Sequence, residues 1–200
     1  MILVQNYYKD KNPLRHLEIE KCLKENVNNH HIRKVLLLID TDVVPDTISK
    51  KIELRRVENR PTYTELFAAA NEAALPDEVA IISNSDIYFD NTLGLAENIP
   101  PDECYALSRW NMVNGELVPF HHSDSQDTWI MRNPIQHVEA QFISGIPGCD
   151  NAIAHYLERA GYNVINPCKK IITIHLHDGN EHNYTAADRV PPPYLRVIPQ

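Results

Sequence analysis

Short apolar runs alternate with longer amphipathic stretches along the first half of the chain. Three runs are apolar at every position, namely residues 2–4, 35–39 and 79–82. Strands that are apolar on both faces are typical of a parallel sheet covered by helices on both sides. A further, more exposed strand is expected over residues 51–57.

Two amphipathic stretches between these runs carry helix-start signals. Asn12 offers an N-cap and Pro13 a first helical position. The apolar stripe predicted for this helix is Leu14, Leu17, Leu23 and Val27. Residues 62–65 form a capping box that opens an Ala-rich helix over residues 63–75. Its predicted core-facing residues are Leu66, Phe67 and Ala70.

The second half of the chain has shorter and more mixed patterns. Strands are expected over residues 103–112, 117–120, 128–131, 163–165 and 171–176. A helix is expected from Asp150, whose carboxylate suits a helix start, to Ala160, with Gly161 closing it. The whole pattern predicts an α/β fold, with a mostly parallel sheet flanked by helices and a mixed second half.

Length, charge and cysteine spacing narrow the class of protein. The 200 residues predict one domain over residues 1–190 and a Pro-rich tail or linker over residues 191–200, which fits a longer parent chain. The net charge of −8 disfavours nucleic acid and anionic membranes as partners. The apolar start is too short for a signal peptide or a membrane span, and the four scattered cysteines predict free thiols. A cytoplasmic location is therefore expected.

The end of the apolar run at residues 79–82 carries the first candidate chemistry. Asn84-Ser85-Asp86 follows it directly, at the sheet edge where ligands collect in open α/β folds. In an extended backbone, Asn84 and Asp86 point to the same side, and their oxygens suit Mg²⁺ or Mn²⁺. An Asx-rich turn that simply ends the strand explains the motif equally well.

Several motifs, taken in order, resemble those of GT-A-type glycosyltransferases that use nucleotide sugars. They are the polar strand end Gln5-Asn6-Tyr7-Tyr8, the acidic strand end at Asp40, Ala68-Ala69-Ala70-Asn71, the DxD-like Asn84-Ser85-Asp86, Gly148-Cys149-Asp150-Asn151, and Ile174-His175-Leu176-His177. The resemblance implies a Rossmann-like GT-A fold with a nucleotide-binding half at residues 1–90 and an acceptor-side half at residues 91–190. The nearest resemblance is to N-terminal glycosyltransferase domains of chlorovirus glycan-building proteins.

The resemblance also implies a divalent cation, Mn²⁺ or Mg²⁺. Asp86 stands at the DxD position that binds the metal directly, whereas Asn84 departs from the family's first Asp and contacts either the metal or the sugar. His175 and His177 lie two apart, so in a strand they face the same way, and one of them completes the metal shell. His177 is the first choice because it is nearer the strand end. For either histidine alone, an imidazole held by neighbouring backbone is the alternative.

Further site residues follow from the same resemblance. Asp150 is expected to be the catalytic base that takes the acceptor's proton, with a simple helix cap as the alternative. The residues expected to bind the nucleotide or donor are Tyr8 (stacking on uracil), Asp40 (base N–H), Arg60 (base or phosphate), Asn84 and Ser85. For Tyr8, Asp40 and Arg60, a surface group with local hydrogen bonds is the alternative. Asp127, in the mixture of carboxylate, amide and aromatic side chains at residues 125–129, is expected to contact hydroxyls of the donor sugar or the acceptor.

The function expected from these residues is inverting glycosyl transfer. A hexose or deoxyhexose of the glucose or rhamnose type would pass from a UDP-sugar to a hydroxyl of a glycan or saccharide acceptor. The alternative is a nucleotide-sugar-binding module without turnover, which the departure at Asn84 favours. Nucleotidyl transfer is disfavoured because it usually needs an early Gly-rich phosphate loop, and the chain has no glycine before Gly94.

Overall fold

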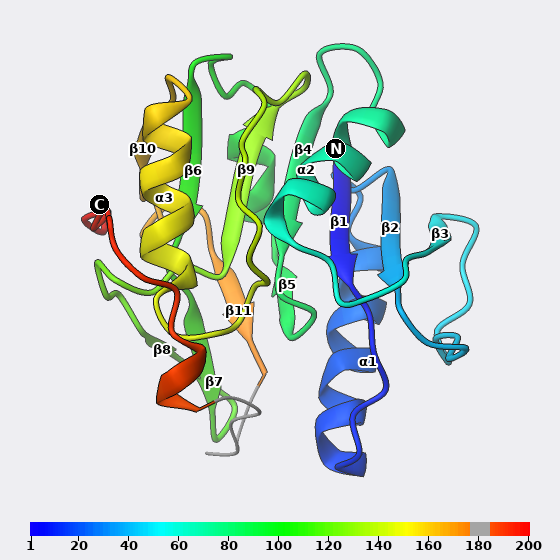
Figure 1. The fold of residues 1–200 in the computed structure, drawn as a ribbon. Coiled ribbons are helices and arrows are strands. Elements are labelled where there is room, and N and C mark those ends of the chain that lie inside the picture. Colours follow the sequence, from blue (N-terminus) through cyan, green and yellow to red (C-terminus); the bar gives the residue numbers. More distant parts are fainter. Residues whose placement is uncertain (177–184) are drawn as a thin grey trace.

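A seven-stranded sheet runs through the centre of the computed structural model, which describes residues 1–176 and 185–200 (Figure 1). Its strands are β1 (Ile2–Asn6), β2 (Lys34–Ile39), β3 (Ile52–Arg56), β4 (Val79–Ser83), β6 (Glu103–Leu107), β9 (Thr128–Arg132) and β10 (Asn163–Ile165). They are ordered β10-β6-β9-β4-β1-β2-β3. β9 is antiparallel to both β4 and β6, and the other neighbouring pairs are parallel. The predicted α/β class with a mostly parallel sheet is confirmed.

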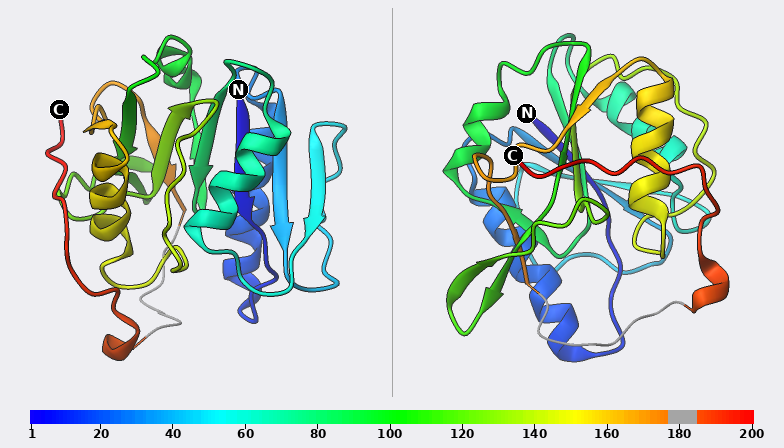
Figure 2. Two further views of the ribbon diagram at one scale, coloured as in Figure 1. Left: turned by 45° about the horizontal axis from the view of Figure 1, so that its top comes forward. Right: turned by 90° about the vertical axis from the view of Figure 1, so that its left-hand side faces the viewer.

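Helices cover the two faces of this sheet and form a separate core on each. The helices are α1 (Pro13–Asn28), α2 (Tyr63–Ala73) and α3 (Cys149–Arg159), with short 3₁₀ helices η1 (Asn91–Ala96) and η2 (Ala186–Asp188). α2 and α3 pack on one face with Val4 and Trp129, whereas α1 and η1 pack on the other with Leu3 and Ile81 (Figure 2). Successive residues of β1 thus enter opposite cores, which explains the apolar run at residues 2–4.

A second, four-stranded sheet lies below the carboxyl ends of the central strands (Figure 1). Its strands are β5 (Ile87–Phe89), β7 (Trp110–Val113), β8 (Glu116–Pro119) and β11 (Thr173–His175), in the order β5-β11-β7-β8. β5 follows β4 after a turn at residues 84–86 and pairs antiparallel with β11, with Ile87 opposite His175. This register brings the late histidine next to the DxD-like turn.

The buried face of α1 differs from the predicted stripe. The helix begins at Pro13 with Asn12 as its N-cap, as predicted, but Leu14 and Leu17 are 71% and 62% exposed. Polar residues replace them on the buried face: the Asn26 side chain donates to the carbonyl of Ile87 at 2.8 Å. Because this amide binds the backbone of β5, the helix is rotated relative to its apolar pattern.

Three further boundaries differ from the sequence pattern. The strand expected over residues 103–112 is broken after Leu107, where the buried Ser108 hydroxyl lies 2.9 Å from the carbonyl of His122 and turns the chain into β7. β5 was not predicted. α3 begins at Cys149 with Gly148 as N-cap at φ 78°, so Asp150 lies in the first turn instead of capping the helix.

The C-terminal segment packs on the domain beside α3 (Figure 2). Backbone N–H groups of Val190, Leu195 and Val197 donate to carbonyls of Pro147, Asn151 and Ser123, each at 2.9 Å. Val190 and Val197 are buried. This segment is therefore part of the packed structure and not an extended spacer, while the domain boundaries stay a prediction. The four cysteines are free and buried, as expected.

Candidate active site

The carboxyl ends of β1, β2 and β4 meet at one edge of the central sheet. The parallel register pairs Asn6 with Leu38 and Val4 with Ile82, so the segments after these strands are neighbours. Ligands bind at such an edge because the strand ends and the loops after them surround a crevice. Tyr8, Asp40 and the turn at residues 84–86 follow these strands, as the sequence predicted.

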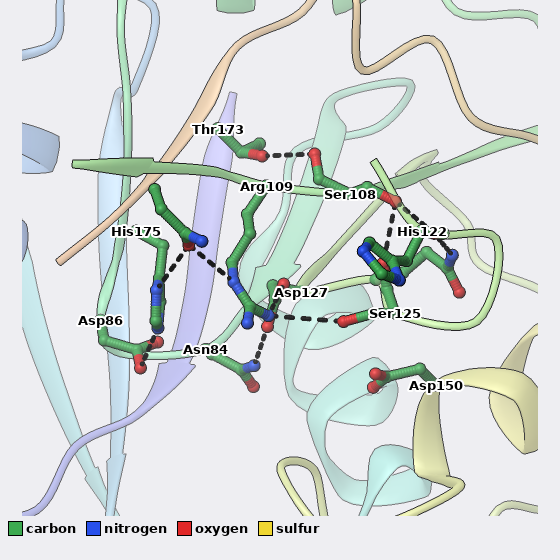
Figure 3. Close-up of polar contacts among 12 residues, drawn as sticks. Asn84, Asp86, Ser108, Arg109, His122, Ser125, Asp127, Asp150, Thr173 and His175 are labelled. Atoms are coloured by element: carbon green, nitrogen blue, oxygen red, sulfur yellow. Dashed lines mark hydrogen bonds and ion pairs between the residues drawn. The ribbon is translucent and has the colours of Figure 1, made fainter. Parts of the chain in front are cut away.

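The turn at residues 84–86 separates the two polar side chains of the DxD-like motif. β4 ends at Ser83, and the N–H of Ile87 donates to the carbonyl of Asn84 at 3.3 Å, which closes a turn. The Asn84 amide donates to Asp127 Oδ1 at 3.0 Å, whereas Asp86 faces His175 (Figure 3). The expectation that both side chains share one strand face is wrong, because the backbone turns between them.

Asp86 is a buried carboxylate with two side-chain partners on one oxygen. Its Oδ2 contacts the Arg15 guanidinium and lies 3.0 Å from His175 Nε2. Burial acts to raise the pKa of Asp86, but His175 and Arg15 outweigh it and hold the pKa well below its usual range. Asp86 Oδ1 has no hydrogen-bond partner among the residues that the structure describes. Asp86 is therefore ionised at neutral pH, with one oxygen unused.

A hydrogen-bonded chain leads from His175 to Asp127 (Figure 3). His175 Nδ1 lies 3.2 Å from Asn111 Oδ1, which also accepts from Arg109 Nε at 3.0 Å. Arg109 Nη1 donates to Asp127 Oδ2 at 2.9 Å. Arginine only donates, so Asn111 presents its oxygen and His175 must donate from Nδ1. Nε2 of His175 then faces Asp86.

Arg109 is the central cation of this chain, and no sequence motif predicted its role. Its guanidinium lies 4.2 Å above the ring of Phe120, which in turn stacks on His122 with ring centroids 4.2 Å apart. The first contact is a cation–π interaction and holds the guanidinium in place. Phe120 and Arg109 come from opposite sides of the β7–β8 hairpin, a contact that no local sequence pattern reveals.

A polar cavity of about 360 Å³ opens beside Asp127. Its lining includes the carboxylates of Asp124, Asp127 and Asp150, the arginines Arg109 and Arg189, and Asn84 and Phe120. A pocket with one aromatic ring and many hydrogen-bonding groups has the composition that hydroxyl-rich ligands require. The expected site residues Asn84, Asp127 and Asp150 thus share one cavity.

Asp150 is a carboxylate whose pKa is strongly perturbed. Burial and the nearby negative charge of Asp127 raise its pKa to about 7. The Cys149 thiol, with Sγ 3.1 Å from Asp150 Oδ1, the N–H of Gln126 and the charge of Arg109 act in the opposite direction. A carboxylate with a pKa near 7 can exchange a proton at neutral pH, which is what a general base requires.

The remaining residues predicted to bind the nucleotide or the donor sugar differ from one another in their surroundings. Burial and the charge of Asp86 raise the pKa of Tyr8, which places Tyr8 close to the Asp86 carboxylate. Asp40 and Ser85 are half-buried at the sheet edge. Arg60 donates to the carbonyl of Ser144 at 2.5 Å, and its charge acts to lower the pKa of Tyr8. His177 lies outside the described residues.

The two tryptophans have structural surroundings. Trp129 is 1% exposed in the core, edge-on to Tyr63, and the Trp110 N–H donates to the carbonyl of Cys168 at 2.9 Å. Phe120 is the aromatic residue that lines the cavity.

The described donors can be tested for their fit to a divalent cation. Over residues 1–176 and 185–200, no group of three or more His, Cys, Asp or Glu side chains forms a metal cluster. Asp86 and His175 nevertheless offer two ligands: an unused buried oxygen and an imidazole oriented by Asn111. Mg²⁺ commonly uses one or two protein ligands and takes the rest from substrate phosphates. The residues therefore fit a cation that binds together with a diphosphate.

Solved structures resemble this fold, although its sequence has diverged. No protein-family model matches the chain, and no curated protein matches it in sequence. S. aureus TarS has a TM-score of 0.53 at 11% identity over 88% of this chain, which spans 36% of the length of TarS. A TM-score of 0.53 at 11% identity is also found for the catalytic domain of Drosophila β1,4-galactosyltransferase 7 in complex with xylobiose. The match covers 93% of this chain and 75% of that domain.

The likeness at this level concerns the fold. The chain shares a Rossmann-like α/β fold of the GT-A type with these two structures, as the sequence motifs implied. The 2-C-methyl-D-erythritol 4-phosphate cytidylyltransferase of Francisella tularensis gives a TM-score of 0.49, which is too low to support an argument. The comparisons do not support the nearer resemblance to chlorovirus proteins. In the described part of the chain, every helix is too short or too polar to cross a membrane.

Proposed function

We propose that this protein is an inverting, metal-dependent glycosyltransferase. It would transfer a hexose or deoxyhexose, of the glucose or rhamnose type, from a UDP-sugar to a hydroxyl of a glycan or saccharide acceptor. The observation that carries the proposal is the position and the pKa of Asp150. Its carboxylate lies on the wall of a polar cavity that is also lined by Asn84 and Asp127, and its pKa is about 7. The GT-A-like fold supports the same class of reaction.

The donor diphosphate would bind at Asp86 and His175. The side chains of Asp86 and His175 would hold Mn²⁺ or Mg²⁺. The bound cation would stabilise the negative charge of the departing UDP. Tyr8 and Asp40, at the ends of β1 and β2, would contact the uracil base, and Arg60 and Ser85 would border the nucleotide.

The sugar and the acceptor hydroxyl would meet in the cavity. Asn84 and Asp127 line the donor side and are already joined by a hydrogen bond of 3.0 Å. Asp150 would take the proton of the attacking hydroxyl on the side opposite the leaving group. A single base is enough for this chemistry, and proton removal by a well-placed base accelerates such reactions by about 10²–10⁴-fold.

Release of UDP from a panel of UDP-sugars tests this proposal. With Mn²⁺ present, the wild-type protein should release UDP in the presence of a suitable saccharide, and EDTA should stop the release. Asp86→Ala should abolish metal-dependent turnover, whereas Asp150→Asn should reduce turnover by about 10²-fold or more and leave UDP binding intact. Asp42→Asn, an exposed carboxylate paired with Arg56, is the matched control and should behave like the wild type.

A binding module without turnover is the second candidate. Two observations favour it: Asn84 replaces an acidic residue, and both oxygens of Asp127 are engaged by Asn84 and Arg109. Calorimetry that shows UDP-sugar binding, together with no UDP release across the donor panel, would establish this alternative.

If the protein does release UDP, full activity of Asp150→Asn would exclude Asp150 as the base.

A further inference from the structure

Arg15 lies at the centre of the proposed diphosphate site. It is in the first turn of α1, and its guanidinium contacts Asp86 Oδ2. Its Nη1 donates to Glu18 Oε2 and to the carbonyl of Leu176, both at 3.0 Å. The side chain is 15% exposed. Arg15 thus bridges α1 and the segment after β11 while it neutralises Asp86.

The position of Arg15 is unfavourable for the helix itself. The first turn of a helix has a positive partial charge, so acidic residues are favoured there and a cation is not. The first turn of α1 contains no acidic residue. The sequence therefore places a positive charge against the local helix field, and the structure shows that the Asp86 carboxylate compensates for it. The need for a cation beside Asp86 explains this placement.

The oxygen that Arg15 contacts belongs to the carboxylate assigned to the cation. Arg15 and the imidazole of His175 meet at Asp86 Oδ2, while Oδ1 has no partner within residues 1–176 and 185–200. Arg15 also lies within electrostatic reach of Tyr8, the residue proposed to stack on the base. A nucleotide-sugar diphosphate lies between its base and its sugar. Arg15 therefore contacts the proposed metal ligand and lies within electrostatic reach of the proposed base contact, so it is placed to bind that diphosphate.

We propose that Arg15 is a diphosphate-binding residue that competes with the divalent cation for Asp86 in the donor-free protein. This inference rests on the proposed function. When donor and cation bind together, Asp86 turns to the cation and Arg15 to a phosphate oxygen. The charges of the cation and Arg15 then balance those of Asp86 and the diphosphate. The planar guanidinium matches phosphate oxygens through paired hydrogen bonds, and Glu18 keeps it close to the site.

Two binding measurements on the whole protein test this competition. Calorimetric titration of nucleotide-free protein with Mn²⁺ should show binding about tenfold tighter in Arg15→Gln than in the wild type, because an intramolecular competitor is removed. Titration with UDP at saturating Mn²⁺ should show binding about tenfold weaker in the same variant. Arg55→Gln removes a half-buried arginine on β3 that pairs with Glu72, and it should change neither affinity.

Arg15→Lys separates charge from geometry and serves if Arg15→Gln does not fold. It should leave the Mn²⁺ affinity of nucleotide-free protein near the wild-type value, because the competing charge is kept. UDP binding should weaken by about threefold, because a lysine has no paired donors. Thermal melting should confirm that each variant is folded.

The outcomes separate this inference from the proposed function. UDP binding to the wild type, with both affinities unchanged in Arg15→Gln, would overturn the role of Arg15 and leave the proposed function intact. Equal UDP binding with Mn²⁺ and with EDTA, lost in Arg15→Gln, would mean that the guanidinium replaces the cation, which overturns the competition. A wild-type protein that binds no UDP would overturn both proposals.

Discussion

Arg109 and Asp127 form an ion pair, with 2.9 Å between Nη1 and Oδ2, at the edge of the cavity that holds Asp150. The two residues act on Asp150 in opposite directions. The negative charge of Asp127 raises the pKa of Asp150, and the positive charge of Arg109 lowers it. The pair is nearly neutral as a whole, so burial has the largest effect on the pKa of Asp150.

Replacing either member of this pair should shift the pH dependence of turnover, and the two replacements should shift it in opposite directions. The base must be ionised, so turnover of the wild type should fall as the pH drops below about 7. Asp127→Asn should move this acid limb to lower pH by about 0.5–1 unit, and Arg109→Gln should move it to higher pH by a similar amount. The pH profile of the rate of UDP release measures both shifts. A limb that stays in place in both variants would exclude Asp150 as the titrating group.

Replacement of Asp150 should stabilise the protein at high pH. Its folded-state pKa, about 7, lies above the ordinary value of 3.8, so the folded protein holds this proton more tightly than the unfolded chain. The contribution of this proton to the free energy of unfolding is therefore complete below pH 3.8 and is lost as the pH rises through 7. Asp150→Asn should raise the melting temperature at pH 8 by about 2–4 °C and change it little at pH 4. Thermal unfolding followed by circular dichroism at both pH values tests this. Equal melting temperatures of the wild type and Asp150→Asn at pH 8 would show that folding does not raise the pKa of Asp150.

The fold was predictable because its strands have an unusual signature. The runs at residues 2–4, 35–39 and 79–82, which lie in β1, β2 and β4, are apolar at every position. A strand needs such a run only when it is buried on both faces. Polar residues on buried faces caused the errors. Asn26 binds the backbone of β5, and Ser108 turns the chain between β6 and β7. Such contacts join distant segments, and periodicity contains no information about them.

The site was predictable where strand order fixes position. Asp86 follows β4, and the parallel register brings it to the same edge as the end of β1. Arg15, Arg109 and Phe120 could not be predicted, because their roles depend on contacts across long sequence separations. Arg15 is the exception in principle: a cation in a first helical turn opposes the helix field and marks a charge partner elsewhere.

The orientation of His175 should depend on Asn111. The Asn111 side-chain oxygen accepts from Arg109 and from His175 Nδ1, which leaves Nε2 directed at Asp86. Partners that fix the tautomer of a metal-binding histidine contribute about tenfold or more to metal affinity. Asn111→Ala should therefore weaken Mn²⁺ binding in the presence of UDP by about tenfold. Asn163→Ala, an exposed change on β10, is the control and should have no effect. Unchanged Mn²⁺ affinity in Asn111→Ala would remove His175 from the proposed metal site.

Gly148 connects the cavity wall to the packed C-terminal segment. It has φ 78°, and a Cβ atom there would lie 2.8 Å from the Tyr194 hydroxyl and 2.9 Å from the carbonyl oxygen of Val190. Gly115 has a similar φ of 84°, but nothing lies within 4 Å of its Cβ position. Both alanine variants incur the backbone strain of a left-handed residue, about 1–2 kcal/mol. Only Gly148→Ala also displaces the segment at residues 190–194.

The difference between these two variants measures how firmly that segment is held. Gly148→Ala should lower the free energy of unfolding by about 1–3 kcal/mol more than Gly115→Ala, because the clash with the carbonyl of Val190 is with backbone and cannot be relieved by a side-chain rotation. Urea unfolding gives the two free energies, and hydrogen exchange at the N–H of Val190, which donates to Pro147, should become faster in Gly148→Ala alone. Equal losses of stability with unchanged exchange at Val190 would show that the segment does not depend on the close approach to Gly148.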